Sequence, residues 1–188
     1  MVQNNILAVL KKHPLIPVVT INSLDEIDEI VNSLFSKNIY CIEVTLRTPI
    51  AFEALAIIKK NFGDKMDVGV GTIINQEQIK KVTEIGVDFI VSPGINSNLA
   101  QALESSSIPF IPGVSTPSEI ISGIQMGWNV FKFFPANLFG GVPAIKTYGQ
   151  VFPEITFCPT GGISESTYNE YLSLANVVSV GGSWMMNK

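Results

Sequence analysis

Short runs rich in β-branched residues alternate with longer amphipathic runs along this chain. The alternation constrains the fold more than any other feature, because a strand, a helix and a further strand in succession require parallel strands joined by right-handed crossovers. The short runs predict eight strands, over residues 16–21, 40–45, 67–71, 89–92, 110–112, 129–133, 156–158 and 177–180. Eight such units favour an α/β protein whose strands close into a (β/α)8 TIM barrel.

The longer runs predict helices between most of these strands. Asn75, Thr116 and Ser164 precede three of them and are residues typical of helix N-caps. An additional N-terminal helix is expected near residues 4–12, where it could close one end of the barrel. The sequence stops at Lys188 soon after the last strand, so the last helix is expected to be missing and one flank uncovered. The helices expected between strands are residues 24–35, 50–62, 75–85, 96–104, 117–126 and 165–174.

An open, doubly wound sheet is the main structural alternative. The turn after the first strand, residues 20–23, contains no glycine, and residues 69–74 lack the third glycine of a dinucleotide-binding fingerprint. A nicotinamide or flavin cofactor is therefore not expected. The length of 188 residues suits one domain over residues 1–188.

The charge balance argues against several partners. Twelve Lys and Arg against sixteen Asp and Glu give a net charge of −4, without a basic run that could follow a phosphate backbone, so nucleic acid is an unexpected partner. No apolar run approaches the length of a membrane span, and the first residues lack the blocks of a signal peptide, which favours a cytoplasmic protein without membrane contact. Cys41 and Cys158 lie in apolar runs and are interpreted as buried structural residues.

Lys132 lies in an unusual place for a lysine, between aromatic residues of an expected buried strand. Strand alternation puts it on one face with Val130 and Phe134, while Phe131 and Phe133 point to the other face. Burial in apolar surroundings disfavours the charged form of a lysine and leaves an amine able to attack a carbonyl. The alternative is a lysine at a strand edge whose ammonium reaches solvent.

Polar and glycine residues gather where the strands end, which is the face on which such barrels build their sites. Alternation places Glu43, Thr45 and Arg47 on one face of the second strand, although a structural ion pair would explain the two charges equally well. Glycine pairs follow the seventh and eighth strands, where barrels commonly hold a phosphate through backbone N–H groups.

His13 is the only histidine, so neither a histidine-based zinc site nor a Ser-His-Asp triad is available, and no metal is expected. A buried lysine, a carboxylate, an arginine and a phosphate cradle together suit carbon–carbon bond chemistry through an imine on the protein, which needs no cofactor.

Several sequence blocks resemble the motifs of the KDPG/KHG aldolases, which cleave 2-keto-3-deoxy-6-phosphogluconate and 4-hydroxy-2-oxoglutarate. The resemblance runs from about residue 16 to residue 184. The blocks that carry it are IEVTLRT (42–48), VGT (70–72), SPG (92–94), IPGVST (111–116), FKFFPA (131–136), FCPTGGIS (157–164) and GGSW (181–184).

The resemblance implies a class I, Schiff-base aldolase, a lyase that releases pyruvate from a keto-acid substrate. It implies that Lys132 forms the imine and Glu43 moves protons. It further implies a homotrimer, which the residues themselves do not show. The remaining implied roles are binding of the pyruvate unit and its carboxylate by Arg47, Thr72, Pro93 and Phe134, stereoselectivity through Thr160, and phosphate binding by Gly161, Gly162, Gly182 and Ser183.

Three alternatives stay open at this point. A related aldolase acting on 2-keto-3-deoxy-6-phosphogalactonate, or on unphosphorylated hydroxy-keto acids, would use the same lysine. A barrel holding pyridoxal phosphate on Lys132 would also need a lysine and a phosphate site. A phosphosugar-binding barrel without catalysis would not need a buried lysine.

Overall fold

The computed structural model describes residues 2–186, and Met1, Asn187 and Lys188 lie outside the described part. Every strand pairing in it is parallel, so the predicted α/β class with parallel strands is confirmed. The strands are β1 (Leu15–Val19), β2 (Cys41–Thr45), β3 (Asp67–Gly71), β4 (Phe89–Val91), β5 (Phe110–Ile111), β6 (Gly113–Val114), β7 (Val130–Phe133), β8 (Thr156–Pro159) and β9 (Val180–Gly182).

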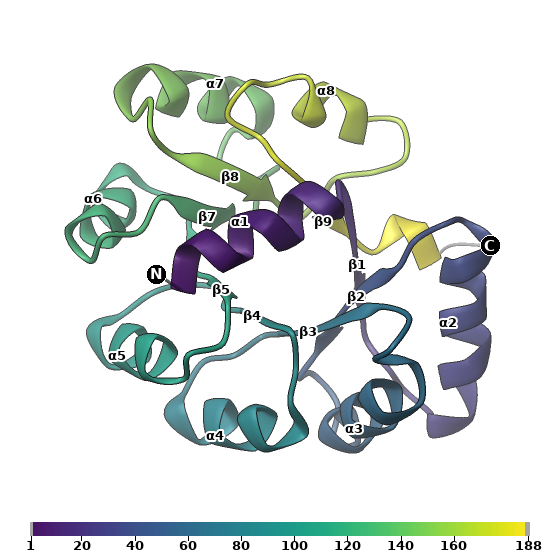
Figure 1. Cartoon of the computed structure of the whole chain (residues 1–188). Helices are drawn as coiled ribbons and strands as arrows, with labels where there is room; N and C mark the ends of the chain where they lie inside the picture. The colour runs from purple at the N-terminus through teal and green to yellow at the C-terminus, as the bar shows by residue number, and fades with distance from the viewer. Residues whose placement is uncertain (1, 187–188) are drawn as a thin grey trace.

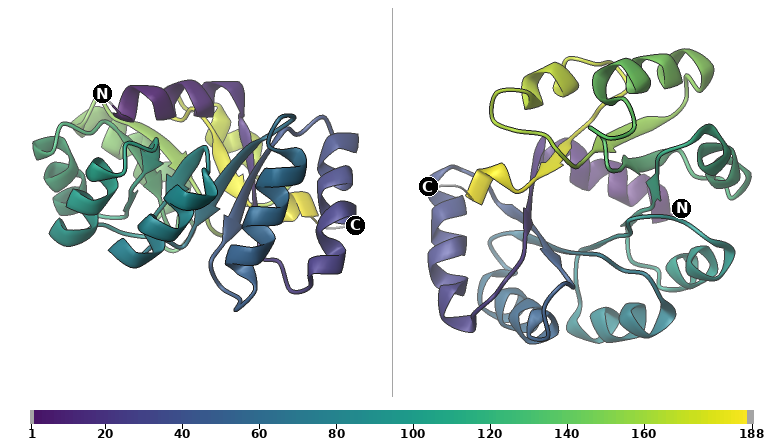
Figure 2. Two further views of the ribbon diagram at one scale, coloured as in Figure 1. Left: turned by 60° about the horizontal axis from the view of Figure 1, so that its bottom comes forward. Right: turned by 180° about the vertical axis from the view of Figure 1, so that it is seen from behind.

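Helices surround the curled strands on the outside, and α1 lies across one end of them (Figures 1 and 2). None of the helices within residues 2–186 has the length and apolar character needed to cross a membrane. The α-helices are α1 (Val2–Lys12), α2 (Ile27–Ser36), α3 (Ala51–Phe62), α4 (Gln76–Ile85), α5 (Ser97–Ser105), α6 (Pro117–Gln125), α7 (Gly141–Val151) and α8 (Tyr168–Leu172). Two short 3-10 helices are η1 (Leu24–Glu26) and η2 (Trp184–Met186).

The strands form two sheets, ordered β5-β4-β3-β2-β1-β9 and β6-β7-β8. Between β5 and β6 the chain passes through Pro112, which has no N–H to donate to a ladder. At the opposite edges of the two sheets, near β8 and β9, isolated parallel bridges join Phe157 to Val177 and Thr160 to Gly181. The sheets are therefore linked at both of these places.

The structure departs from the expected elements in several places, including β6 beyond the strand expected over residues 110–112 and the division of the helix expected over residues 24–35 into η1 and α2. It contains α7, which the sequence did not predict because glycines precede it and Pro143 lies inside it, although proline is tolerated in a first helical turn. The last strand is β9 and not residues 177–180 as expected, and β9 includes the glycine pair that was expected in a turn. The structure also shortens the last expected helix to α8, so that the N-cap is Thr167 rather than Ser164.

Where a further helix was expected to be missing, the described chain continues from β9 into η2. Met185 of η2 is buried, and its carbonyl accepts a hydrogen bond from the Lys37 ammonium just beyond α2, at 2.6 Å. The short 3-10 helix is therefore anchored beside α2.

Strand alternation divides the apolar side chains between two cores. The outer core lies between the strands and the helices and includes Ile42, Val44, Phe131 and Phe133. The inner core lies inside the curl of the sheet, and its buried members are Ile6, Leu10, Ile16, Cys41, Phe89, Val91, Ile111, Val130 and Cys158. Ile6 and Leu10 come from α1, so this helix closes the inner core, as its predicted place suggested.

The side chain of Gln3 links α1 by hydrogen bonds to the amino ends of β5 and β7. Its amide nitrogen donates to the carbonyls of Phe110 and Val130, at 3.3 and 3.4 Å, and its amide oxygen accepts from the N–H groups of Asn129 and Val130. A buried amide costs free energy unless it is paired, and here both ends are paired.

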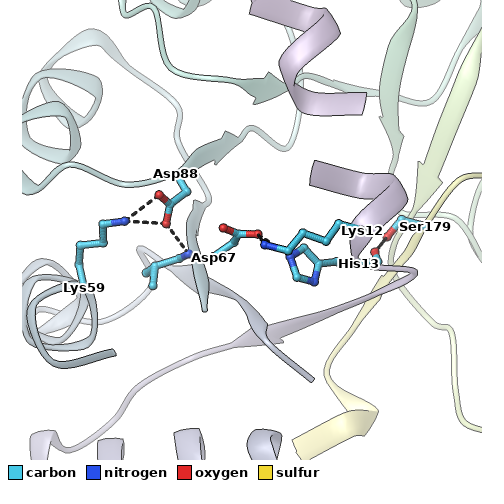
Figure 3. Close-up of polar contacts among 7 residues, drawn as sticks. Lys12, His13, Lys59, Asp67, Asp88 and Ser179 are labelled. Carbon is cyan, nitrogen blue, oxygen red and sulfur yellow. Dashed lines mark hydrogen bonds and ion pairs between the residues drawn. The ribbon is translucent and has the colours of Figure 1, made fainter. Parts of the chain in front are cut away.

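An ionic cluster lies where α1 meets the start of β3 (Figure 3). The ammonium of Lys12 donates to Asp67 at 2.9 Å, and the ring of His13 contacts the same carboxylate. The hydroxyl of Ser179 donates to the carbonyl of His13 at 2.7 Å. Burial raises the pKa of Asp67, but the hydrogen bonds and charges of Lys12 and His13 outweigh burial and hold this pKa below its ordinary value.

We expect Asp67→Asn to lower the free energy of unfolding by roughly 1–2 kcal/mol near pH 7, because a partly buried, charge-assisted contact is lost. A carboxyl with a lowered pKa in the folded state stabilises above the unfolded value of about 3.9, and this contribution is lost as the pH falls through the lower folded pKa. Urea unfolding at pH 7 and pH 3 should therefore show a gap between the variant and wild type that shrinks in acid. Asp64→Asn removes an exposed charge nearby and should change little; an equal loss in both variants would contradict the prediction.

Candidate active site

Lys132 is buried within β7, with 5% of its surface exposed. Its ladder partners are Gly113 on β6 and Cys158 on β8. Val130, two residues earlier, belongs to the inner core, while Phe131 and Phe133 belong to the outer core, as the predicted alternation requires. The alternative of a solvent-exposed lysine is therefore wrong. The amine lies inside the curl of the sheet, on the same face of β7 as Val130 of the inner core and closer to the carboxyl end of the strand.

Glu43 approaches Lys132 from β2. It is 3% exposed, and its Oε1 accepts a hydrogen bond from the Lys132 ammonium at 3.3 Å. The two charges share a buried ion pair, so the predicted alternative of a structural pair between Glu43 and Arg47 is not what the structure contains. A carboxylate at this distance can take a proton from the amine and return it.

Gly71 makes room for the Glu43 carboxylate. A Cβ atom placed on Gly71 would overlap the side-chain oxygen and carbons of Glu43, because β3 lies beside β2 in the sheet. A glycine at this strand end therefore lets the carboxylate lie against the backbone of the neighbouring strand and point at Lys132.

We expect Gly71→Ala to reduce kcat by about 10²-fold while the protein stays folded, because a displacement near 1 Å of a catalytic group costs this much. Steady-state kinetics and circular dichroism would measure the two effects. Gly94→Ala is the matched control, since a Cβ at Gly94 meets no atom within 4 Å. Equal activity of the two alanine variants would contradict the role of Gly71.

The Phe134 ring covers the amine, and Arg47 lines the same cavity as Phe134. The Lys132 Nζ lies 4.9 Å from the centroid of the Phe134 ring, close enough for a cation–π contact. Arg47 follows β2, is exposed and lines a cavity that Phe134 also lines. Within residues 2–186 the guanidinium has no ion-pair partner, so it is free to bind an anion from solution.

Thr72 and Pro93 end the neighbouring strands β3 and β4. Thr72 has a φ of 66°, in the left-handed region that a β-branched residue rarely adopts. Such strain persists where the surroundings enforce it and is frequent at functional sites. Pro93 is half-buried, and a Cβ on Gly113 would overlap its backbone, so the ends of β4 and β6 approach closely here.

The cavity at the carboxyl ends of the strands has a volume of about 480 Å³. It brings together most of the predicted binding residues but not all. The predicted residues that line it are Arg47, Phe134, Thr160, Gly161, Gly162, Gly182 and Ser183. Lys132, Glu43, Thr72 and Pro93 are not among its lining residues, and Lys132 lies behind the Phe134 ring.

The glycine turns of the cavity expose backbone. Gly161 and Gly162 have φ angles of 101° and 67°, which side-chain-bearing residues rarely adopt, and a Cβ on Gly162 would overlap Asn137. Thr160, directly before them, is buried and its backbone bridges to Gly181. Backbone N–H groups in such turns form concave sites for anions.

The two cysteines are free and buried in the inner core, as predicted. Burial raises the pKa of Cys158 to about 12, although the Lys132 charge acts in the opposite direction. Burial likewise raises the pKa of Cys41 well above its ordinary value. Both thiols stay protonated at neutral pH, so they do not compete with Lys132 as nucleophiles.

Sequence reasoning missed the part of the cavity that the loop after β1 provides. Thr20, Asn22 and Glu26 line it, together with Ile30 of α2 and Met186 of η2. The signal was present, because residues 20–23 follow a strand at its carboxyl end. The polar side chains of Thr20 and Asn22 in that turn are the local signal of a binding loop.

The site therefore combines a buried amine, a carboxylate in contact with it, and an adjacent cavity with an unpaired guanidinium and exposed backbone donors. An amine held this way can attack a ketone, and the carboxylate can move the protons that imine formation requires. Fold and site together define a class of enzyme in which a lysine at the carboxyl ends of parallel strands attacks a carbonyl substrate.

Comparison with known proteins makes the assignment specific. The model of the KDPG and KHG aldolase family matches residues 6–188. The KHG/KDPG aldolase of Escherichia coli is 40% identical over 179 residues, which cover 95% of this chain and 84% of that protein. This chain belongs to the KDPG and KHG aldolase family, whose members are lyases.

Two crystal structures are closely similar. That of KDPG aldolase from Legionella pneumophila, with pyruvate captured at low pH as a covalent carbinolamine intermediate, has a TM-score of 0.93 and 44% identity over 97% of this chain and 88% of that one. That of the 2-keto-3-deoxy-6-phosphogluconate aldolase of Zymomonas mobilis ZM4 with 3-phosphoglycerate has a TM-score of 0.92 and 36% identity over 97% and 86%.

Proposed function

We propose that this protein is a class I aldolase. It cleaves 2-keto-3-deoxy-6-phosphogluconate to pyruvate and glyceraldehyde 3-phosphate, 4-hydroxy-2-oxoglutarate to pyruvate and glyoxylate, or both. The observation that carries the proposal is the Lys132 amine, buried 3.3 Å from the Glu43 carboxylate and covered by Phe134, which lines the adjacent cavity. Family membership supports the same reaction class.

The reaction begins when the Lys132 amine attacks the C2 ketone to form a carbinolamine. Glu43 then protonates the hydroxyl of the carbinolamine, which leaves as water, and an iminium forms on Lys132. Glu43, or a water that it holds, then takes the proton of the C4 hydroxyl. The C3–C4 bond breaks, its electron pair moves into the iminium, and the aldehyde leaves an enamine on the lysine. Protonation at C3 and hydrolysis release pyruvate and restore the free amine.

Residues of the cavity, together with Thr72 and Pro93 beyond the ends of β3 and β4, bind the two ends of the substrate in this proposal. Arg47 and Thr72 hold the carboxylate of the pyruvate unit, with Pro93 and Phe134 beside it. The Arg47 guanidinium supports this, because it is exposed and has no ion-pair partner among residues 2–186. Thr160 lies next to the bond that breaks and influences stereochemistry. The distal phosphate is held by Gly161, Gly162, Gly182 and Ser183, which is supported by their place around the cavity.

Two measurements on the wild-type protein test the function. Pyruvate release from each keto acid is followed with coupled lactate dehydrogenase, and protein mixed with pyruvate and borohydride is digested for mass spectrometry. Turnover and a reduced pyruvate adduct on the Lys132 peptide are expected. Folded protein that gives neither would overturn the proposal, and visible absorbance of the purified protein would instead indicate pyridoxal phosphate.

We also propose that the two sheets close into a single eight-stranded barrel. Two observations support this. β5 pairs with β4 while β6, one residue beyond β5, pairs with β7, so β5 and β6 act as one strand interrupted at Pro112. The bridge between Thr160 and Gly181 spans β8 and β9. The barrel would form one domain over residues 1–188.

A homotrimer in the cytoplasm completes the proposal. Leu138 and Phe139, in the loop before α7, are 75% and 44% exposed, which is unusual for adjacent large apolar side chains and suits burial by a second subunit. The free, buried thiols suit a reducing compartment. Analytical ultracentrifugation would test the trimer, and Leu138→Glu should weaken it if this loop lies in the interface.

A further inference from the structure

The loop after β1 brings a negative charge to the end of the cavity where a distal phosphate would lie. β1 and β9 are paired, with Pro17 opposite Gly182, so the chain leaving β1 runs beside the carboxyl end of β9. Asn22 and Glu26 on this loop line the cavity together with Gly182.

Among residues 2–186, Glu26 and Arg47 are the charged residues that line this cavity. Arg47 already has a role at the pyruvate end of the substrate. The other lining groups at the distal end are neutral: the Gly161 and Gly162 backbone and the Ser183 hydroxyl. A phosphate dianion bound there would thus meet neutral donors and one carboxylate.

The Glu26 carboxylate is held in place by the start of η1. Its Oε1 accepts hydrogen bonds from the N–H groups of Asn22 and Ser23, at 2.6 and 3.3 Å, as part of a capping box with Ser23. Within residues 2–186 no Lys or Arg forms an ion pair with it. The negative charge therefore stays at the cavity wall without an ion-pair partner among residues 2–186.

We propose that Glu26 is a specificity-determining residue that weakens binding of a phosphate dianion relative to an uncharged distal end. Substrates favoured by this charge are unphosphorylated 4-hydroxy-2-oxo acids. A short substrate such as 4-hydroxy-2-oxoglutarate carries its second carboxylate on C4, one of the two carbons of the broken bond. Such a substrate does not extend to this loop. The proposal rests on the proposed aldolase function and adds a discrimination between its substrates.

The test compares wild type with Glu26→Gln on 2-keto-3-deoxy-6-phosphogluconate and on its counterpart without phosphate. Glutamine keeps the acceptor oxygen of the capping box and removes the charge. We expect kcat/KM for the phosphorylated substrate to rise about three- to tenfold in Glu26→Gln. This is the Coulomb effect of removing a unit charge that repels a dianion at roughly 8–10 Å in water-like surroundings. The gain should come through KM, shrink at high salt, and leave the unphosphorylated substrate within about twofold.

Asp25→Asn is the matched control, because Asp25 is the adjacent exposed carboxylate and does not line the cavity. An equal change for both substrates, or none in Glu26→Gln, would overturn the proposal.

Calorimetric binding of glycerol 3-phosphate separates this proposal from the aldolase function. Glu26→Gln should bind it three- to tenfold more tightly than wild type, whether or not either protein turns over substrate. Unchanged affinity overturns the role of Glu26 even in an active aldolase. Absence of the borohydride-trapped pyruvate adduct, in contrast, counts against the aldolase function alone.

Discussion

Lys132→Met should abolish the pyruvate adduct and reduce kcat/KM by at least about 10⁴-fold, the scale of loss when a covalent nucleophile is removed. Methionine has a similar length and fills the buried space, but it has no amine to attack the ketone. The measurement is mass spectrometry after borohydride treatment with pyruvate, together with turnover of both keto acids.

The variant needs a test of folding, because Lys132 is the buried partner of Glu43. Removing one partner of a buried pair leaves an uncompensated charge and typically costs 3–5 kcal/mol. The double variant Lys132→Met/Glu43→Gln removes both charges and should recover most of that stability without recovering activity. Lys146→Met, at an exposed position of α7, should behave as wild type. An adduct that persists in folded Lys132→Met protein would place the imine on another lysine.

Glu43→Gln should reduce kcat by about 10²–10⁴-fold, which is the usual contribution of a general acid–base group. The amide keeps the shape of the carboxylate at β2 but cannot exchange protons with the amine or the substrate. Pyruvate should still be trapped on Lys132, more slowly than in wild type, because the amine is still present. Single-turnover trapping alongside steady-state kinetics would separate imine formation from carbon–carbon cleavage.

The neighbouring Thr45→Val variant serves as the control for this strand. Thr45 faces the same side of β2, is buried, and is hydrogen-bonded to Thr20 at 2.8 Å without contacting Lys132. We expect a modest loss of stability and little loss of kcat. Wild-type turnover in Glu43→Gln would remove the proton-transfer role and leave Glu43 as a counter-ion of the lysine.

Local patterns predicted the burial of the site residues because strand alternation has a fixed period of two. Alternation put Lys132 on the face of Val130 and Glu43 on the face of Thr45, and the structure contains both arrangements. The same rule could not say which charge would meet Glu43. Arg47 was the nearest candidate in sequence, yet the partner is Lys132, which is 89 residues away.

The elements that were misjudged lie where glycine and proline carry the local signal. Gly181 and Gly182 indicated a turn, but they belong to β9, where glycine lets Thr160 and the Trp184 ring pack against the strand. The strand expected over residues 110–112 ends at Pro112, whereas in the structure strand pairing resumes beyond the proline as β6. Glycine and proline mark exceptional backbone positions without telling whether a turn, a bulge or a close approach is the reason.

The sequence by itself determined the α/β class, the parallel strands, the burial of Lys132 and the gathering of polar residues at strand ends. These properties depend on periodicity and on neighbours within a few residues. Only the tertiary structure decided that Glu43 pairs with Lys132, that Gly71 leaves space for this carboxylate, and that Glu26 enters the cavity wall. The physical reason is that these contacts join distant strands and loops, whose relative positions are set by the curl of the sheet and not by local preference.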